Sequence, residues 1–216
     1  MADNLQMTTI VLALALAWAS GLRLYVVLLL VGVAGYFHWF GFQIPPSLDL
    51  LIHPIVIGTS ALLVILEFFA DKIPGVDTIW DAIHTFIRIP AGALLAAGFV
   101  SQGDVAAWTI AAGLLGGTIA AGSHFLKAGS RAVINTSPEP VSNWGASFTE
   151  DAIVLGGLWL AFQHPLVFIG LLICIIALTI WLLPKIWRLA KRALPSLTRL
   201  TSRTATKQAG QINPTA

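Results

Sequence analysis

Residues 71–88 read DKIPGVDTIWDAIHTFIR, a polar and charged stretch set inside an otherwise apolar chain. Pro74 and Gly75 precede the helix that this stretch predicts, and Pro90 is expected to end or kink it. On a helix, residues three or four apart share a face, so one polar stripe forms from Asp77, Asp81, His84 and Arg88. Isoleucine and phenylalanine dominate the opposite side. The stretch therefore predicts an amphipathic helix that borders a membrane.

The composition identifies an integral membrane protein. Of 216 residues, 57% are hydrophobic and 10% are charged, and the mean hydropathy is +0.85. A soluble domain of this size cannot bury so much apolar surface. The sequence predicts an all-α polytopic fold of six to seven helical segments, some of them short or broken. Residues 5–187 are expected to form the transmembrane domain, and 188–216 a basic cytoplasmic tail that is partly disordered.

Seven apolar runs suggest the segments: 5–19, 22–40, 51–70, 89–101, 105–126, 148–163 and 165–184. Runs 5–19, 89–101 and 148–163 are shorter than the ~20 residues of a full span. Each adjoins a longer run through a minimal break, at Ser20-Gly21, residues 102–104 and His164-Pro165. The short runs are expected to be tilted spans, re-entrant half-helices or halves of a broken helix. Two capping boxes, Thr78 with Asp81 and Ser147 with Glu150, predict helix starts.

The basic residues predict the orientation. Seven of the 12 lie from residue 185 onward, where no acid occurs: Lys185, Arg188, Lys191, Arg192, Arg199, Arg203 and Lys207. Such a tail favours the cytoplasmic side and anionic lipid. With the tail inside, counting the spans backwards places every other basic residue at a cytoplasmic end. We therefore expect a cytoplasmic C-terminus, and we expect no nucleic-acid partner.

Small residues in run 105–126 predict close helix packing. Gly113 and Gly117 form a GxxxG motif that Ala121 extends. The motif predicts packing within the chain or a homo-oligomer through these three residues.

The polar residues are expected to converge at the cytoplasmic ends of the helices. The candidate substrate-binding or proton-pathway residues are Arg23, Glu67, Asp71, Asp77, Asp81, His84, Arg88, Arg131 and Glu139. Residues 127–147 are expected to form a loop beside them. An unpaired charge at membrane depth is costly, so Arg23 and Arg131 are expected near Glu67 or Asp71.

Four interpretations of this group stay open. The acids and His84 suit a hard or borderline cation, although their spacing matches no established metal motif. The arginines suit a phosphate or carboxylate, and acids, histidine and arginine beside a broken helix suit a proton relay. The fourth interpretation is a solvated helix lying on the inner leaflet, with its charges paired locally. Glu67 is the strongest single candidate, because an apolar setting favours its protonated form and makes it a plausible proton carrier.

Two stretches carry a family resemblance: EFFADKIPGVDTIWDAIHTFIRIPAGALLAAG (67–98) and SHFLKAGSRAVINTSPEP (123–140). Together they resemble a bacterial multi-pass inner-membrane family known as domain of unknown function 4126, over roughly residues 7 to 185. The resemblance implies a polytopic bacterial inner-membrane protein and carries over no substrate and no catalytic residues.

The favoured function is a small transporter or permease. It is indicated by the short helices, by the charged group at the inner ends and by a repeated His-Pro pair at residues 53 and 164. The alternatives are a membrane-embedded enzyme acting on a lipid or isoprenoid phosphate, and a non-catalytic scaffold or assembly factor. The sequence favours a non-enzyme, because it contains no P-loop, GxSxG or HExxH motif. No cofactor and no bound metal are expected.

Overall fold

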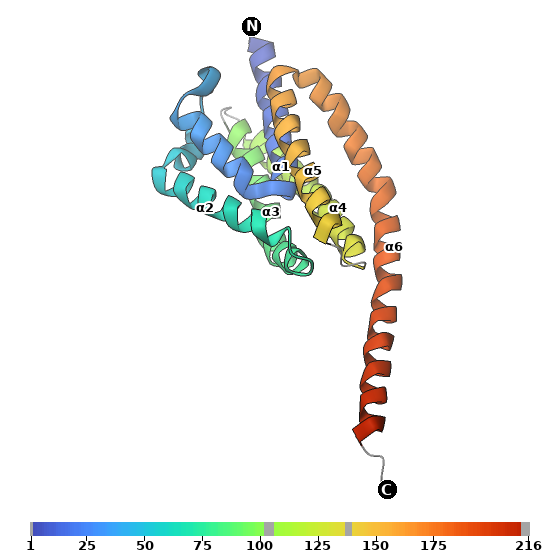
Figure 1. The fold of residues 1–216 in the computed structure, drawn as a ribbon. Helices are drawn as coiled ribbons and strands as arrows, with labels where there is room; N and C mark the ends of the chain where they lie inside the picture. The colour runs from blue at the N-terminus through green and yellow to red at the C-terminus, as the bar shows by residue number, and fades with distance from the viewer. Residues whose placement is uncertain (1, 102–105, 137–139, 213–216) are drawn as a thin grey trace.

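The computed structural model describes residues 2–101, 106–136 and 140–212. All regular structure in these ranges is helical, which confirms the predicted fold class. In chain order the elements are α1 (Ala2–Tyr36), η1 (Trp39–Gly41), η2 (Pro46–Ile52), α2 (Pro54–Ala70), α3 (Val76–Val100), α4 (Ala106–Ile134), α5 (Pro140–Gln163) and α6 (Pro165–Ile212). Figure 1 shows the N-terminus and the α5–α6 turn at one end of the bundle, and α6 extending far beyond the other end.

Four helices are long and apolar enough to cross a membrane: Met7–Tyr36 of α1, α3, α4 and Pro165–Arg188 of α6. The pair η2 and α2, bent by 64° at residue 53, adds a fifth if it counts as one broken span. Both His-Pro pairs begin a helix, since α2 starts at Pro54 and α6 at Pro165. Proline suits this position because the first turn of a helix leaves its N–H groups unpaired anyway. The chain is therefore a multi-pass helical membrane protein.

α1 is broken at Arg23, whose backbone angles (φ −143°, ψ 69°) are not helical. The sequence predicted a break at Ser20-Gly21, and the structure places it two residues later. The stretch before the break occupies the centre of the bundle (Figure 1), and most side chains between residues 7 and 22 are buried. The short run 5–19 is thus the first part of a long, bent helix.

Two other predicted boundaries are wrong. α3 continues through Pro90 to Val100, so run 89–101 is its second half and no helix starts there. Proline is tolerated inside a membrane helix because neighbouring helices stabilise the distorted turn. α5 begins at Pro140, and Ser147 lies inside it instead of capping it. At the start of α3, the carboxylate of Asp77 accepts hydrogen bonds from the N–H groups of Gly75 (2.9 Å) and Thr78 (2.7 Å), in place of the predicted capping box.

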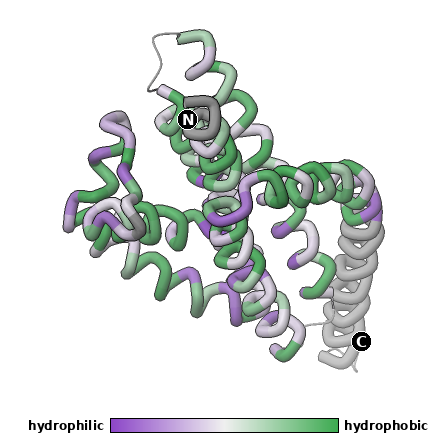
Figure 2. Tube along the Cα trace, turned by 90° about the horizontal axis from the view of Figure 1, so that it is seen from above, coloured by the Kyte–Doolittle hydropathy of each residue, from purple (hydrophilic) through white to green (hydrophobic). Residues whose placement is uncertain are grey.

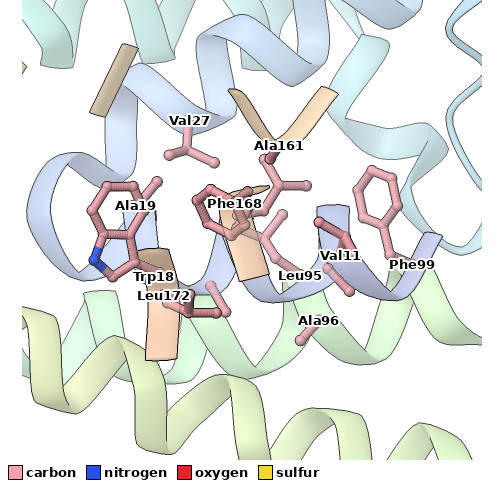
Figure 3. Close-up of a cluster of buried hydrophobic side chains, with 14 of the residues drawn as sticks. Val11, Trp18, Ala19, Val27, Leu95, Ala96, Phe99, Ala161, Phe168 and Leu172 are labelled. Carbon is pink, nitrogen blue, oxygen red and sulfur yellow. The ribbon is translucent and has the colours of Figure 1, made fainter. Parts of the chain in front are cut away.

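The apolar core lies around the first half of α1. Figure 3 shows Trp18 and Val11 of α1 with Leu95 and Phe99 of α3 and with Phe168 of α6. Trp18 meets the ring of Phe168 edge-on at 5.9 Å, an arrangement that aromatic pairs favour. The core therefore joins helices from both halves of the chain.

Small residues let α3 and α4 approach α1 closely. A Cβ atom added at Gly92 would lie 2.5 Å from Ala120 Cβ and 2.7 Å from Ser20 Oγ, so only glycine fits there. The GxxxG residues Gly113 and Gly117 face Ala93 of α3 within the same chain, at 3.6 and 3.3 Å from an added Cβ. The motif thus serves packing inside the chain, and a homo-oligomer through the same face remains a prediction.

Charged side chains lie inside the bundle, and many large apolar side chains lie on its outer surface. Helices are mostly hydrophobic along their length, with hydrophilic positions in the middle of the bundle as well as in the connections (Figure 2). On α3, Ile79 is 63% exposed and Phe86 is 84% exposed, whereas Asp77 and Arg88 are fully buried. A solvated helix on the inner leaflet would expose its polar side, so that interpretation is wrong. The apolar face of α3 suits lipid, and its polar face forms part of the interior.

Candidate functional site

The four polar residues of α3 share one face, as the sequence predicted, and the structure shows that this face is buried. Asp77, Asp81 and Arg88 have exposed fractions of 1% or less, and His84 has 6%. Helical spacing aligns them, and the apolar residues between them turn the stripe toward the bundle axis. The face that the sequence indicated is therefore the interior face.

α4 and α5 carry matching polar stripes that the sequence prediction missed. Residues 127–134 and 140–147, expected to lie in a loop, are helical, so the prediction of a loop over 127–147 is wrong. The buried polar residues of α4 are Ser123, His124, Lys127 and Arg131, and those of α5 are Asn143 and Ser147. Both sets recur every three or four residues, and this helical spacing is the signal in the sequence that could have revealed the two stripes. Their polarity had suggested an exposed loop.

Arg88 and Glu67 form the centre of the site. Glu67, on the last turn of α2 and 1% exposed, forms an ion pair with Arg88. Arg88 Nη1 also lies 2.7 Å from Asp81 Oδ1. Lys127 Nζ lies near four carboxylates, at 3.1 Å from Asp71, 3.4 Å from Asp81, 3.6 Å from Glu150 and 3.7 Å from Glu67. One buried lysine and one buried arginine thus hold together acids from the end of α2, from α3 and from α5.

Arg23 projects into the same region from the break in α1. It forms an ion pair with Asp71, and its Nη1 lies 4.0 Å from Glu67 Oε1. Its Nε lies 2.8 Å from Asp151 Oδ1, and its Nη2 donates to the Ser147 hydroxyl at 2.9 Å. Nη1 and Nη2 therefore each donate a hydrogen bond, whereas Nε lies close to Asp151 without hydrogen-bond geometry.

Arg131 joins α4 to α5 and to the end of α2. Its Nε and Nη2 donate to the two oxygens of Glu150 at 3.1 and 3.0 Å. This two-pronged geometry is the strongest that arginine makes with a carboxylate. Its Nη1 donates to the backbone carbonyl of Asp71 at 3.0 Å. The predicted proximity of Arg23 and Arg131 to Glu67 or Asp71 is confirmed.

Eleven charged residues make up what we call the buried charge cluster. Its basic members are Arg23, Lys72, Arg88, Lys127 and Arg131, and its acidic members are Glu67, Asp71, Asp77, Asp81, Glu150 and Asp151. Nine of the eleven have exposed fractions of 7% or less. The basic members are all the basic residues that precede the tail. With six acids and five bases, the fully ionised cluster carries one excess negative charge.

The electrostatics can be seen at Asp71, just after the end of α2. Burial alone would raise the pKa of Asp71, but the positive charges of Lys127, Arg23 and Arg131 outweigh it and hold the pKa below the usual 3.8. For the neighbouring Lys72, burial lowers the pKa, and its ammonium group lies 3.1 Å from the centre of the Phe68 ring. Asp71 is therefore an ionised anchor of the cluster.

Five side-chain atoms of the cluster have no hydrogen-bond partner among the described residues: the Nε atoms of Arg23 and Arg88, and the carboxylate oxygens Glu67 Oε2, Asp71 Oδ1 and Asp81 Oδ2. Buried acceptors are nearly always satisfied, by protein or by ordered water. These oxygens are therefore places where water, a proton or a cationic ligand group can bind. No three His, Cys, Asp or Glu side chains in the described ranges are arranged to hold a metal ion.

A cavity of about 270 Å³ opens beside the cluster, between α1, α2 and α5. Its lining residues are Arg23, Val26, Val64, Glu67, Phe68, Asp151, Val154 and Leu155. Three of these are charged members of the cluster, and the other five are apolar. The cavity thus connects an apolar wall to Glu67, whose Oε2 is unpaired.

One predicted candidate lies apart from the ion pairs. His84 stacks on Trp80 at 4.2 Å, and its Nδ1 lies 2.6 Å from the Trp80 carbonyl. Glu139 lies outside the described residues. The sequence prediction missed Lys127, Glu150 and Asp151 as site residues, and His124, which is fully buried and lies 2.7 Å from the Thr85 hydroxyl. The structure brings together seven of the predicted candidates, whose role in substrate or proton handling stays a prediction: Arg23, Glu67, Asp71, Asp77, Asp81, Arg88 and Arg131.

Comparison with known proteins gives a family and no activity. The chain matches the family described as a domain of unknown function (DUF4126) over residues 10–185 and belongs to that family. The match contains the whole cluster and the cavity. No curated protein and no solved structure matches the chain.

Proposed function

We propose that this member of the DUF4126 family is a small proton-coupled permease in which Glu67 accepts and releases the proton. The observation that carries the proposal is the carboxylate of Glu67, which is 1% exposed, bears an unpaired oxygen and borders the cavity. Ionisable residues within membrane spans are expensive, and substrate or ion pathways and proton relays are among the roles that they mark.

The excess negative charge supports a proton as the coupling ion. Six acids and five bases leave one negative charge in a low-dielectric interior, where an unbalanced charge is costly. One proton neutralises the cluster, and it is shared among interacting groups instead of belonging to one residue alone. Glu67 is the best-placed acceptor because its second oxygen is free and reaches the cavity.

The break in α1 supports transport. Many secondary transporters bind their substrates where a helix is interrupted within the membrane. Arg23 lies at such an interruption and contacts Asp71, Ser147 and Asp151 on two other helices. Protonation of Glu67 weakens its hold on Arg88 and Arg23, which offers a way to couple the proton to a movement of these helices.

The two alternatives have weaker support. A phosphate-binding enzyme needs guanidinium groups free to hold its substrate, and Arg23, Arg88 and Arg131 are each paired with a carboxylate. A scaffold needs its charges paired, yet three buried oxygens lack partners in the described structure. Unpaired buried acceptors destabilise a protein, so a purely structural cluster gains nothing from them.

The proposal includes a place and an orientation. The basic tail after residue 185 favours a cytoplasmic C-terminus at a bacterial inner membrane, with anionic lipid around the tail. The five remaining lysines and arginines are all in the cluster, so the proposal places the cluster toward the cytoplasmic side of the bundle.

Proteoliposomes that contain a trapped pH-sensitive dye test the function. A pH gradient is imposed in either direction, alone and with small metabolites and ions added one at a time. We expect protein-dependent proton movement that Glu67→Gln abolishes, with the variant still eluting as a folded particle. Arg188→Met, an exposed change outside the cluster, is the control and is expected to leave the flux unchanged. Absence of proton movement in every condition would contradict the proposal.

A further inference from the structure

The cavity between α2 and α5 has the shape and chemistry of a ligand site. Val64 and Phe68 of α2 form one side, and Val154 and Leu155 of α5 form the other. Leu155 is 49% exposed, so this side reaches the surface that faces lipid. A molecule dissolved in the membrane can therefore enter sideways, between the two helices.

The polar lining of the cavity consists of Arg23, Glu67 and Asp151, one base and two acids. Arg88 and Lys127, outside the lining, contact the other oxygen of Glu67. Glu67 is almost completely buried, and its Oε2 has no partner in the described structure. An unpaired acceptor at the end of an apolar pocket favours a ligand that brings both a donor and a positive charge.

The same geometry disfavours an anion. Two nitrogens of Arg23 donate hydrogen bonds, Nη1 to Asp71 and Nη2 to the Ser147 hydroxyl (2.9 Å), and Nε lies 2.8 Å from Asp151 Oδ1 without forming a hydrogen bond. An anionic group would have to displace one of these partners and would lie beside Glu67. A neutral apolar molecule would leave Glu67 Oε2 unsatisfied.

We propose that this cavity binds a hydrophobic monovalent organic amine, with its ammonium group on Glu67 and its apolar body between α2 and α5. This inference rests on the proposed function and names the substrate class of the same site. The ammonium group takes the place of the proton on Glu67, so amine and proton compete for one carboxylate. Competition for a single acid makes amine entry depend on proton release.

Three probes of similar shape and different charge test the site: 1-naphthylmethylamine, 1-naphthylmethanol and 1-naphthoate. Binding is measured by titration calorimetry on the full chain in lipid nanodiscs, with empty nanodiscs as the blank. We expect the amine to bind at least about tenfold more tightly than either analogue, equivalent to about 1.4 kcal/mol. Equal binding of the alcohol or of the carboxylate would overturn the inference.

Two matched tryptophan variants locate the site. Leu155→Trp fills the cavity and leaves the charges in place, whereas Leu114→Trp puts the same side chain on an exposed position of α4, 70% exposed and outside the lining. Leu155→Trp is expected to weaken amine binding at least about tenfold and Leu114→Trp to leave it unchanged. Amine binding that survives Leu155→Trp would refute the location.

Glu67→Gln and a pH series complete the test. The glutamine variant is expected to lose the preference for the amine over the alcohol, and amine binding to the unmodified protein is expected to weaken as the pH falls. If the amine binds but no proton moves in proteoliposomes, the site stands and the proposed function fails. If protons move and the amine does not bind, the substrate class is wrong and the proposed function stands.

Discussion

Arg88→Met tests whether the buried charges hold the bundle together as pairs. Arg88 is fully buried and joins Glu67 of α2 to Asp81 of its own helix, the latter at 2.7 Å. Methionine keeps much of the length and apolar volume of the side chain and removes the charge. The variant therefore leaves two buried carboxylates that have lost their shared arginine.

The contacts determine the size of the effect. Removing one member of a buried pair typically destabilises a protein by about 3–5 kcal/mol, because the other charge is left uncompensated. Lys127 stays 3.4 Å from Asp81 and 3.7 Å from Glu67, so we expect the lower end of that range, about 3 kcal/mol. In the double variant Arg88→Met with Glu67→Gln, Asp81 keeps Lys127 and no acid is left alone. We expect the double variant to lose only about 1 kcal/mol, less than the single variant.

The assay is reversible unfolding in mixed detergent micelles, followed by tryptophan fluorescence. Arg188→Met, which removes an exposed basic residue, is the control and is expected to change the unfolding free energy by no more than about 0.5 kcal/mol. The reasoning is refuted if Arg88→Met matches this control, or if the double variant is less stable than Arg88→Met alone.

Three further predictions follow from the structure. The pKa of Asp71 is held below 3.8, so its ion pairs stabilise the fold above about pH 4. We therefore expect the unfolding free energy in micelles to be constant near neutral pH and to fall as the pH drops below about 4. Single cysteines in a cysteine-free background test the orientation: one at Ile73 is expected to react with an impermeant reagent only in inside-out vesicles, and one at Leu50 only in intact cells, both sites being exposed. A reversed pattern would contradict the cytoplasmic C-terminus. Gly92→Val is expected to prevent folding, because its side chain would collide with α1 and α4. A Cβ atom at Gly170 meets nothing within 4 Å, so Gly170→Val is the control and is expected to fold normally. If the two variants gave the same size-exclusion profile, the close packing at Gly92 would be dispensable.

Much of the fold could be predicted because a membrane imposes strong rules. Apolar runs must be helical, since every backbone polar group needs a partner in lipid. The all-α class and a break near the Arg23 position followed from this rule. The helix boundaries did not: Pro90 lies inside α3, and Ser147 lies inside α5. Proline and capping signals are local, and packing against neighbouring helices overrides them.

The candidate site was predicted in part. Residues on apolar segments, such as Glu67 and the α3 stripe, stood out against their surroundings. Lys127 lies in a polar stretch, where charge suggests a solvated loop, and Glu150 was interpreted as part of a capping box. Their burial follows from the pairing of α4 and α5 with α1, which brings Arg131 onto Glu150 at 3.0 Å.

The sequence by itself determined that this chain is a helical membrane protein. It also determined the positions of polar stripes along the chain and the need for positive and negative side chains to lie together. These properties depend on composition and on the 3.6-residue period, which act over one or two turns. Only the tertiary structure decided that the polar stripes face inward, that all five basic residues before the tail join one cluster, and that Glu67 keeps a free oxygen beside a cavity. Those properties depend on which helices pack together, because a charge in lipid is stable only where distant segments bring it a partner.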